Sequence, residues 1–346
     1  MHSESEVIKP PPSHVRRWLY MLSSVLIGAL FLYLTARNVD LEQALETIYA
    51  INGWWIIPLT LVYILSFVLR GLRWQLMFPD ESRPSLRHAI DAFMIGRVCN
   101  NFLPGRLGEL IRATVMGKIL PRVGLSGSVA TIVLEKIFDA FAVLVLLGVA
   151  LFFAPLPPWL SNAGLAMIIV LPAMLLALVI VDKADAHISH PSEGATSAGI
   201  IVRLMAFVRQ ILQKFSTGLF ALRTAHHFTL LSALTLFIWG WEVIILFICL
   251  QAFSIPVPFT AALVTLVFLC VGSMLPAAPG FIGTYQLFIV AALQLYSVPD
   301  TNAFALSVFL NLYVIILTLI LGVVAILLEG GIFNLKQVLS SIMGRP

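Results

Sequence analysis

The sequence has little charge: of its 346 residues, 11% are Asp, Glu, Lys or Arg, and 60% are hydrophobic. Soluble domains usually carry about 25% charged residues. Several apolar runs reach the roughly 20 residues that a helix needs to cross a bilayer. The polar segments between these runs are short. We therefore expect an all-α polytopic membrane protein without a separate soluble domain.

The sequence also lacks the usual signatures of metal, nucleotide and channel proteins. Its three cysteines, Cys99, Cys249 and Cys270, lie in or beside apolar runs and form no Cys-x-x-Cys pair, so we interpret them as buried small hydrophobes. His226 and His227 are a lone pair, whereas zinc needs three or four ligands. With no Walker motif or repeated filter sequence, we expect no metal, no cofactor, no ATP hydrolysis and no nucleic-acid partner.

Six apolar runs are long enough to span a membrane, at about 18–35, 54–72, 125–153, 163–181, 228–253 and 303–328. No small-x-small cleavage site follows the first run, so we predict a retained helix rather than a signal peptide. We predict a disordered cytoplasmic tail over 1–15, one integral-membrane domain over 16–330 and a short cytoplasmic tail over 331–346.

The basic residues indicate the orientation. With the N-terminus in the cytoplasm, loop 182–227 and the C-terminus lie there too, and of the 21 Lys and Arg residues only Arg37 falls in an outer loop. Basic residues concentrate in cytoplasmic loops, so we predict that both termini are cytoplasmic. Within the loop, residues 200–222 alternate apolar and basic residues at helical intervals, which predicts an amphipathic surface helix.

Two segments interrupt the apolar pattern. One reads Asn-Asn-Phe-Leu-Pro-Gly-Arg-Leu-Gly-Glu-Leu-Ile-Arg over 100–112, and the other reads Pro-Gly-Phe-Ile-Gly-Thr-Tyr-Gln over 279–286. Pro lacks an N–H and Gly does not restrict the backbone, so both residues break helices. At membrane depth a break is tolerated only where protein or water satisfies the freed backbone groups. The short apolar helices expected around each break predict two re-entrant pairs.

The two breaks share the pattern Pro-Gly-x-x-Gly, at 104–108 and 279–283. In the predicted topology the first enters from the cytoplasm and the second from outside. That is the arrangement of an inverted-topology repeat, in which the broken elements meet near the bilayer midplane. The alternative is two independent Pro-Gly turns in a chain that contains 22 Gly and 19 Pro.

Charged side chains gather at the first break and in the span that follows it. Glu135 and Asp139 are four residues apart and share a helix face, and Lys136 lies about 100° round the helix from Glu135. Three acids and three bases are equal in number, which allows a structural salt-bridge cluster: Glu109, Glu135, Asp139, Arg106, Arg112 and Lys136. A charge at the bilayer centre costs at least ~2.5 kcal/mol. Because apolar packing avoids that cost, binding of an anionic head group by Arg and Lys is the favoured reading.

Three further charges complete the pattern. Glu242 is either a partner of this cluster or an interfacial acid. Arg70 and Arg73 end an apolar run, so we predict that they reach the cytoplasmic interface. The candidate substrate-binding residues are Asn101, Pro104, Gly105, Arg106, Gly108, Glu109, Arg112, Glu135, Lys136, Asp139, Pro279, Gly280, Gly283, Tyr285 and Gln286.

These motifs resemble the membrane region of lysylphosphatidylglycerol synthase/flippase proteins, including stand-alone relatives that lack the catalytic domain. The resemblance rests on residues 101–112, 135–139 and 279–286 and extends over about 18–330. It implies a bacterial or archaeal inner-membrane protein that moves a lipid between leaflets. The family's aminoacyl transfer resides in a soluble C-terminal domain, and we expect it to be absent because this chain ends soon after its last span.

Two departures from the family pattern bear on specificity. The family usually has Glu-Arg-x-x-Asp, and here Lys136 replaces the Arg, which keeps the charge but loses the guanidinium fork. The second Pro-Gly motif usually continues to a Glu, whereas here Thr284, Tyr285 and Gln286 follow. We therefore expect a different head-group preference or ion coupling.

The function that the sequence favours is a lipid flippase or a transporter of a lipid-linked substrate, with the charge cluster between the two breaks as its site. The alternative is a non-transporting partner of a lipid- or glycan-modifying enzyme, with residues 200–222 as the docking surface; a homo-oligomer also fits. An intramembrane enzyme is less favoured, because no nucleophile–base spacing accompanies Glu135 and Asp139.

Overall fold

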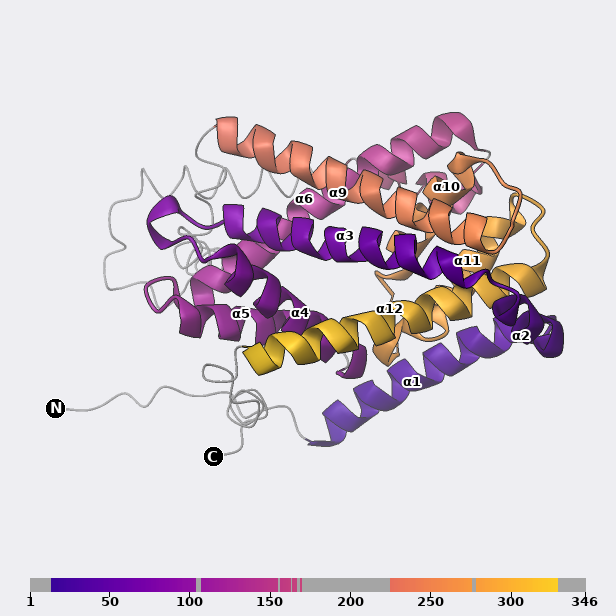
Figure 1. The fold of residues 1–346 in the computed structure, drawn as a ribbon, viewed down its shortest axis with the longest axis horizontal. Coiled ribbons are helices and arrows are strands. Elements are labelled where there is room, and N and C mark those ends of the chain that lie inside the picture. Colours follow the sequence, from indigo (N-terminus) through magenta and orange to yellow (C-terminus); the bar gives the residue numbers. More distant parts are fainter. Residues whose placement is uncertain are drawn as a thin grey trace, which may run out of the picture.

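The computed structural model describes residues 14–103, 107–154, 225–275 and 278–328, with short pieces between 156 and 169. Within these residues the regular elements are helices (Figure 1). The long helices are α1 (His14–Ala36), α3 (Ile56–Leu76), α6 (Gly124–Phe153), α9 (Ala225–Ala252) and α12 (Asp300–Leu328). The shorter ones are α2 (Leu41–Tyr49), α4 (Leu86–Phe102), α5 (Leu107–Ile119), α10 (Phe259–Gly272) and α11 (Thr284–Gln294), with 3₁₀ turns η1 (Gly53–Trp55), η2 (Asp80–Ser82) and η5 (Pro279–Phe281).

Several helices have the length and composition of membrane spans. Four segments qualify in the described part of the chain, namely Gly53–Leu76, Gly124–Phe153, His226–Ala252 and Asp300–Leu328. The pair α1–α2, bent by 90°, gives a fifth if it counts as one span. The prediction of an all-α polytopic membrane protein is confirmed. Most of the predicted span 163–181, the amphipathic helix 200–222 and nearly all of both tails lie outside the described residues.

The long helices are apolar on the faces that pack and on the faces that do not. Leu61 of α3 is 63% exposed and Ile316 of α12 is 55% exposed, although both lie in strongly apolar segments. In water such side chains would turn inward, whereas a bilayer solvates them and demands only that the backbone bond internally. The apolar outer surface is therefore what a lipid environment requires.

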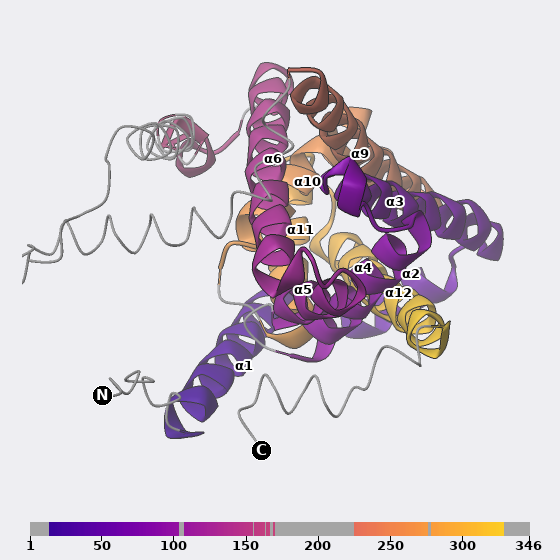
Figure 2. The same cartoon turned by 90° about the vertical axis from the view of Figure 1, so that its left-hand side faces the viewer.

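Two pairs of short helices lie inside this bundle. α4 packs on α5, and α10 packs on α11. In Figure 1, α5 lies toward one end of the bundle and the α10–α11 pair toward the other. End-on, α4 and α5 lie among α3, α6 and α12 (Figure 2). η5, in the second break, packs against α4, so the two pairs meet inside the molecule. The side of the membrane from which each pair enters stays a prediction.

Glycines allow the backbones to approach closely around both breaks. A Cβ atom on Gly108 of α5 would collide with the carbonyl oxygen of Gly96 on α4. At the second break Gly283, with φ of 86°, packs on Gly28 of α1 so closely that a Cβ would overlap the Gly28 carbonyl. Small residues permit such contacts between membrane helices. The break pattern therefore serves packing as well as chain reversal.

Candidate functional site

Polar side chains satisfy the backbone at each break. Asn100 Oδ1 accepts a hydrogen bond of 2.8 Å from the backbone N–H of Gly108, across the first break. Gln286 Oε1 accepts one of 2.6 Å from the N–H of Gly283 in the second. Backbone groups freed by a break in a bilayer need a partner in the protein or water. Asn100 and Gln286 supply that partner, which explains polar residues beside Pro and Gly.

Helix α12 is tied to both breaks. The side-chain amide of Asn101 donates a 2.7 Å hydrogen bond to Thr318 Oγ1. Asn311 Nδ2 donates a 2.9 Å hydrogen bond to the carbonyl oxygen of Gly280. Each pair of short helices is thus anchored to the same long helix, which fixes the position of one break relative to the other.

A closed network, which we define as Arg73, Arg112 and Glu135, lies buried between α3, α5 and α6. Arg112 Nη2 is 2.7 Å from one oxygen of Glu135, and Arg73 Nη2 is 3.4 Å from the other. Arg73 also donates a 2.6 Å bond to Asp139. The Arg73 side chain is 0% exposed and that of Arg112 is 4% exposed. These charges compensate one another within the protein, as buried charges must.

Aromatic rings complete the surroundings of Arg112. Its guanidinium carbon lies 3.7 Å from the ring centre of Trp74 and 4.9 Å from that of Phe93. The Trp74 indole in turn donates a 2.9 Å hydrogen bond to Thr131. A guanidinium stacked on a ring and paired with a carboxylate is held in one orientation. This geometry gives Arg112 a structural role in joining α3, α4, α5 and α6.

The prediction that Arg70 and Arg73 reach the cytoplasmic interface is wrong. Arg73 is fully buried, and Arg70 Nη2 lies 2.8 Å from Glu242 Oε1. Helix α3 runs on to Leu76, beyond the apolar run, and packs against α4 and α9, so the end of that run is inside the bundle. Glu242 also accepts a 2.6 Å bond from Ser66. Its ion-pair partner is thus Arg70, which is not a member of the predicted six-charge cluster.

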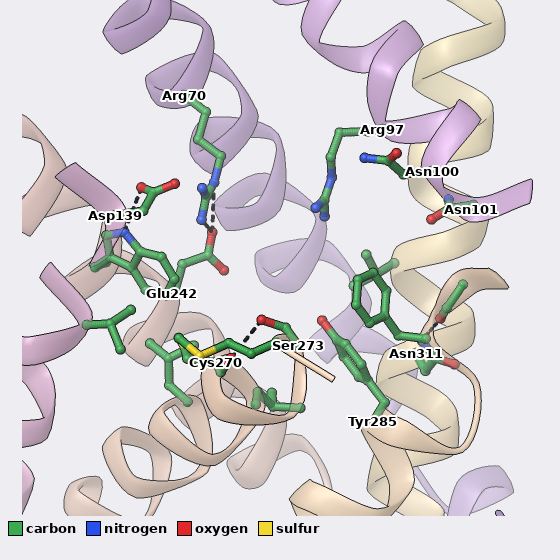
Figure 3. A pocket seen from close by; sticks show the side chains of 18 of the residues that line it. Arg70, Arg97, Asn100, Asn101, Asp139, Glu242, Cys270, Ser273, Tyr285 and Asn311 are labelled. Carbon is green, nitrogen blue, oxygen red and sulfur yellow. Dashed lines mark hydrogen bonds and ion pairs between the residues drawn. The ribbon is translucent and has the colours of Figure 1, made fainter. Parts of the chain in front are cut away.

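A cavity of about 440 Å³ lies beside the closed network, between the two pairs of short helices (Figure 3). Residues from α3, α4, α5, α6, α9, α10, η5, α11 and α12 line it. Its polar lining consists of Tyr63, Arg70, Arg97, Asn100, Asn101, Glu109, Lys136, Asp139, Trp239, Glu242, Ser273, Tyr285 and Asn311. A polar cavity of this kind inside a helical membrane bundle is a functional-site candidate.

Asp139 of the lining pairs with Arg73 of the closed network. We call the other charged lining residues the open wall: Arg70, Arg97, Glu109, Lys136 and Glu242. Lys136 Nζ lies 3.0 Å from Glu109, and Arg70 is paired with Glu242. The remaining member, Arg97 of α4, extends into the cavity (Figure 3) and has no hydrogen bond or ion pair with any residue that the structure describes. The open wall therefore presents one uncompensated guanidinium.

The structure brings part of the predicted site together. Six predicted residues line the cavity: Asn101, Glu109, Lys136, Asp139, Gly280 and Tyr285. Six others are not in the lining: Gly108, Arg112, Glu135, Pro279, Gly283 and Gln286. Pro104, Gly105 and Arg106 lie outside the described residues. The substrate-binding roles of all the predicted site residues stay predictions.

Arg97 and Asn311 are two of the lining residues that sequence reasoning missed. Arg97 precedes Asn100 and Asn101 by three and four positions, so a single helix face connects it to the first break, and that spacing is visible in the sequence. Asn311 is a lone amide within a long apolar run, and polar side chains in such runs commonly bond across helices.

Metal binding has no support in the described part of the chain. No group of three or more His, Cys, Asp and Glu side chains there is arranged to hold a metal ion. The cysteines are free thiols, with Cys249 and Cys270 buried and Cys99 partly buried. The cavity lining supplies charged groups and hydrogen-bond donors.

Comparison with known proteins identifies the family to which the chain belongs. The profile of a family described as "Lysylphosphatidylglycerol synthase TM region" matches residues 21–322. The chain belongs to this family. The match covers every residue that lines the cavity. It confirms the family resemblance seen in the motifs.

A relative of the chain is the UPF0104 membrane protein of Methanothermobacter thermautotrophicus. The two are 26% identical over 245 residues, which is 64% of this chain and 70% of that protein. This likeness agrees with membership of the lysylphosphatidylglycerol synthase TM-region family and with a membrane protein.

Proposed function

We propose that this member of the family is a flippase-like transporter, which carries the polar head group of a lipid through the internal cavity while the lipid tails stay in the bilayer. The observation that carries the proposal is a polar, charged cavity within a bundle of membrane-spanning helices. Charged groups at this depth are costly and mark substrate pathways. Family membership supports a membrane role.

The walls of the cavity suit alternating access. Glu109 belongs to the α4–α5 pair, whereas Ser273 and Tyr285 belong to or border the α10–α11 pair, and all three line the cavity. In transporters with inverted repeats, the site lies where two broken elements meet, and one repeat rocks against the other. We also propose that both termini lie in the cytoplasm. In that orientation the α4–α5 pair enters the membrane from the cytoplasm and the α10–α11 pair enters it from outside.

The test is lipid transfer in liposomes that contain the purified protein and fluorescent anionic, zwitterionic or lysyl-modified lipids. A membrane-impermeant quencher reports how much label is exposed in the outer leaflet. The variant Ala140→Trp places a large ring in the cavity lining. Val149→Trp places the same ring on the same helix, at a position that is 40% exposed and outside the lining.

We expect wild type and Val149→Trp to transfer at least one lipid, and Ala140→Trp to lose transfer. Equal transfer by both variants would show that lipids do not use this cavity. Folded wild-type protein that transfers no lipid would overturn the proposal and favour the alternative, a non-transporting partner of a lipid- or glycan-modifying enzyme.

A further inference from the structure

The described charges in and beside the cavity do not balance. They comprise four acids and five bases: Glu109, Glu135, Asp139, Glu242, Arg70, Arg73, Arg97, Arg112 and Lys136. Each of the four acids forms an ion pair with one of the other four bases. The shortest N···O distance for each acid is between 2.6 and 3.0 Å. What remains is a single positive charge, on Arg97.

Arg97 faces neutral hydrogen-bond donors across the cavity. Tyr285 of α11 reaches in from the opposite wall with its hydroxyl turned toward Arg97 (Figure 3). Within the described residues that hydroxyl makes no hydrogen bond. Asn100 lies one helical turn from Arg97, and because its Oδ1 binds Gly108 its Nδ2 amide group remains a donor. A guanidinium, a phenol and an amide together form a donor set for an anionic oxygen.

We infer that the cavity selects a lipid head group with one net negative charge, a phosphodiester without an amine, and that Arg97 is its ligand. The inference rests on the proposed function for its choice of a lipid as the source of the phosphate. Arg97 belongs to the first pair of short helices and Tyr285 to the second, so the bound phosphate bridges the two halves of the cavity.

The same charges disfavour other head groups. An ethanolamine or choline cation needs a carboxylate, and each carboxylate of the lining, Glu109, Asp139 and Glu242, is held by a protein cation. A dianionic phosphomonoester would bring a second negative charge that Arg97 does not compensate. Uncompensated charge is expensive where water is scarce. The cavity therefore discriminates by net charge.

The test is equilibrium binding to the purified, full chain in detergent. The probes are dihexanoyl phosphatidylglycerol (one negative charge), dihexanoyl phosphatidylethanolamine (zwitterionic) and inorganic phosphate (no tails). The variants are Arg97→Gln, Arg97→Lys and Tyr285→Phe. Arg37→Gln is the matched control, because Arg37 is exposed, follows the end of α1 and is absent from the cavity lining.

We expect wild type and Arg37→Gln to prefer phosphatidylglycerol. Arg97→Gln should lower the affinity for phosphatidylglycerol about 10- to 100-fold, as for loss of a charge-assisted hydrogen bond. It should leave the affinity for phosphatidylethanolamine unchanged. Tyr285→Phe should lower the affinity for phosphatidylglycerol several-fold. Arg97→Lys keeps the charge and should keep the preference at lower affinity, which preserves the test if the Gln variant does not fold.

Three results would overturn the inference: an Arg97→Gln protein that binds phosphatidylglycerol as wild type does, an equal loss for both lipids, or inorganic phosphate bound as tightly as the lipid. If the Gln variant does not fold, an Arg97→Lys protein without the preference would also do so. Because binding is measured without transfer, an Arg97-dependent preference would stand even if liposomes showed no transport. That separates failure of this inference from failure of the proposed function.

Discussion

Two groups of arginines in this bundle differ in what lies in front of them. In the closed network, Arg73 and Arg112 pair with carboxylates of the protein, Arg112 also stacks on the Trp74 ring, and at most 4% of either side chain is exposed. In the open wall, Arg97 extends into a cavity and has no partner among the described residues. The residue type is the same, and all three lie inside the bundle.

The difference teaches that charge inside a membrane protein is informative only together with its partners. A guanidinium whose hydrogen bonds are made by Glu135 and whose face is covered by Trp74 stabilises helix packing, and it has little capacity left for a substrate. A guanidinium without partners has that capacity. Removing charges from the two groups should therefore have different consequences, which the following variants measure.

The largest effect is expected for Glu135→Gln in the closed network. The substitution leaves Arg73 and Arg112 with a neutral partner between them, and breaking a buried ion pair typically costs about 3–5 kcal/mol. We expect a marked fall in the thermal unfolding temperature of the detergent-solubilised protein. Glu109→Gln removes the same charge from a partly exposed pair and serves as the control. A Glu135→Gln protein as stable as that control would remove the distinction between the two groups.

Most of the fold could be predicted from apolar runs and helix breakers. The runs at 54–72, 125–153, 228–253 and 303–328 became α3, α6, α9 and α12, because a stretch of this length and composition has few alternatives in a bilayer. The helix α2 was not predicted, because 38–52 is a polar, acidic stretch between spans. Asp40 caps it by accepting hydrogen bonds from the N–H groups of Glu42 and Gln43. This capping residue is visible in the sequence, but in a polar stretch it is also typical of a loop.

The candidate site was harder to predict, because burial depends on neighbours that are distant in the sequence. Arg73 ends an apolar run, which is also where interfacial arginines occur, and only the packing of α9 and α6 around α3 distinguishes the two. Arg97 lies in a helix of mixed polarity, before the Pro-Gly break. Its spacing from Asn100 and Asn101 was visible, but its lack of a partner is a property of the folded cavity.

An intermediate effect is expected for Glu242→Gln in the open wall. Glu242 accepts hydrogen bonds from Arg70 and Ser66, and losing a bond to a charged group costs about 1.5–3 kcal/mol. The variant also frees a second guanidinium, so the cavity should gain affinity for a dianionic phosphomonoester, measured with dihexanoyl phosphatidic acid.

Ser66→Ala is the matched control, because it removes a hydrogen bond to the same carboxylate and leaves the charge unchanged. We expect a smaller loss of stability and no change in charge preference. Should Glu242→Gln bind the phosphomonoester no better than Ser66→Ala does, net charge would not govern recognition in the open wall.

The smallest effect is expected for the pair Glu109–Lys136, whose side chains are 28% and 43% exposed. Exposed ion pairs contribute about 0.2–1 kcal/mol, because water already solvates both charges. A double-mutant cycle with Glu109→Gln, Lys136→Gln and the double variant should give a coupling free energy in this range, measured by thermal unfolding in detergent. A coupling as large as the loss caused by Glu135→Gln would mean that this pair is shielded from water, and Glu109 and Lys136 would then belong with the closed network. Small coupling would show that this pair contributes little to stability, in contrast to the ion pairs of the closed network.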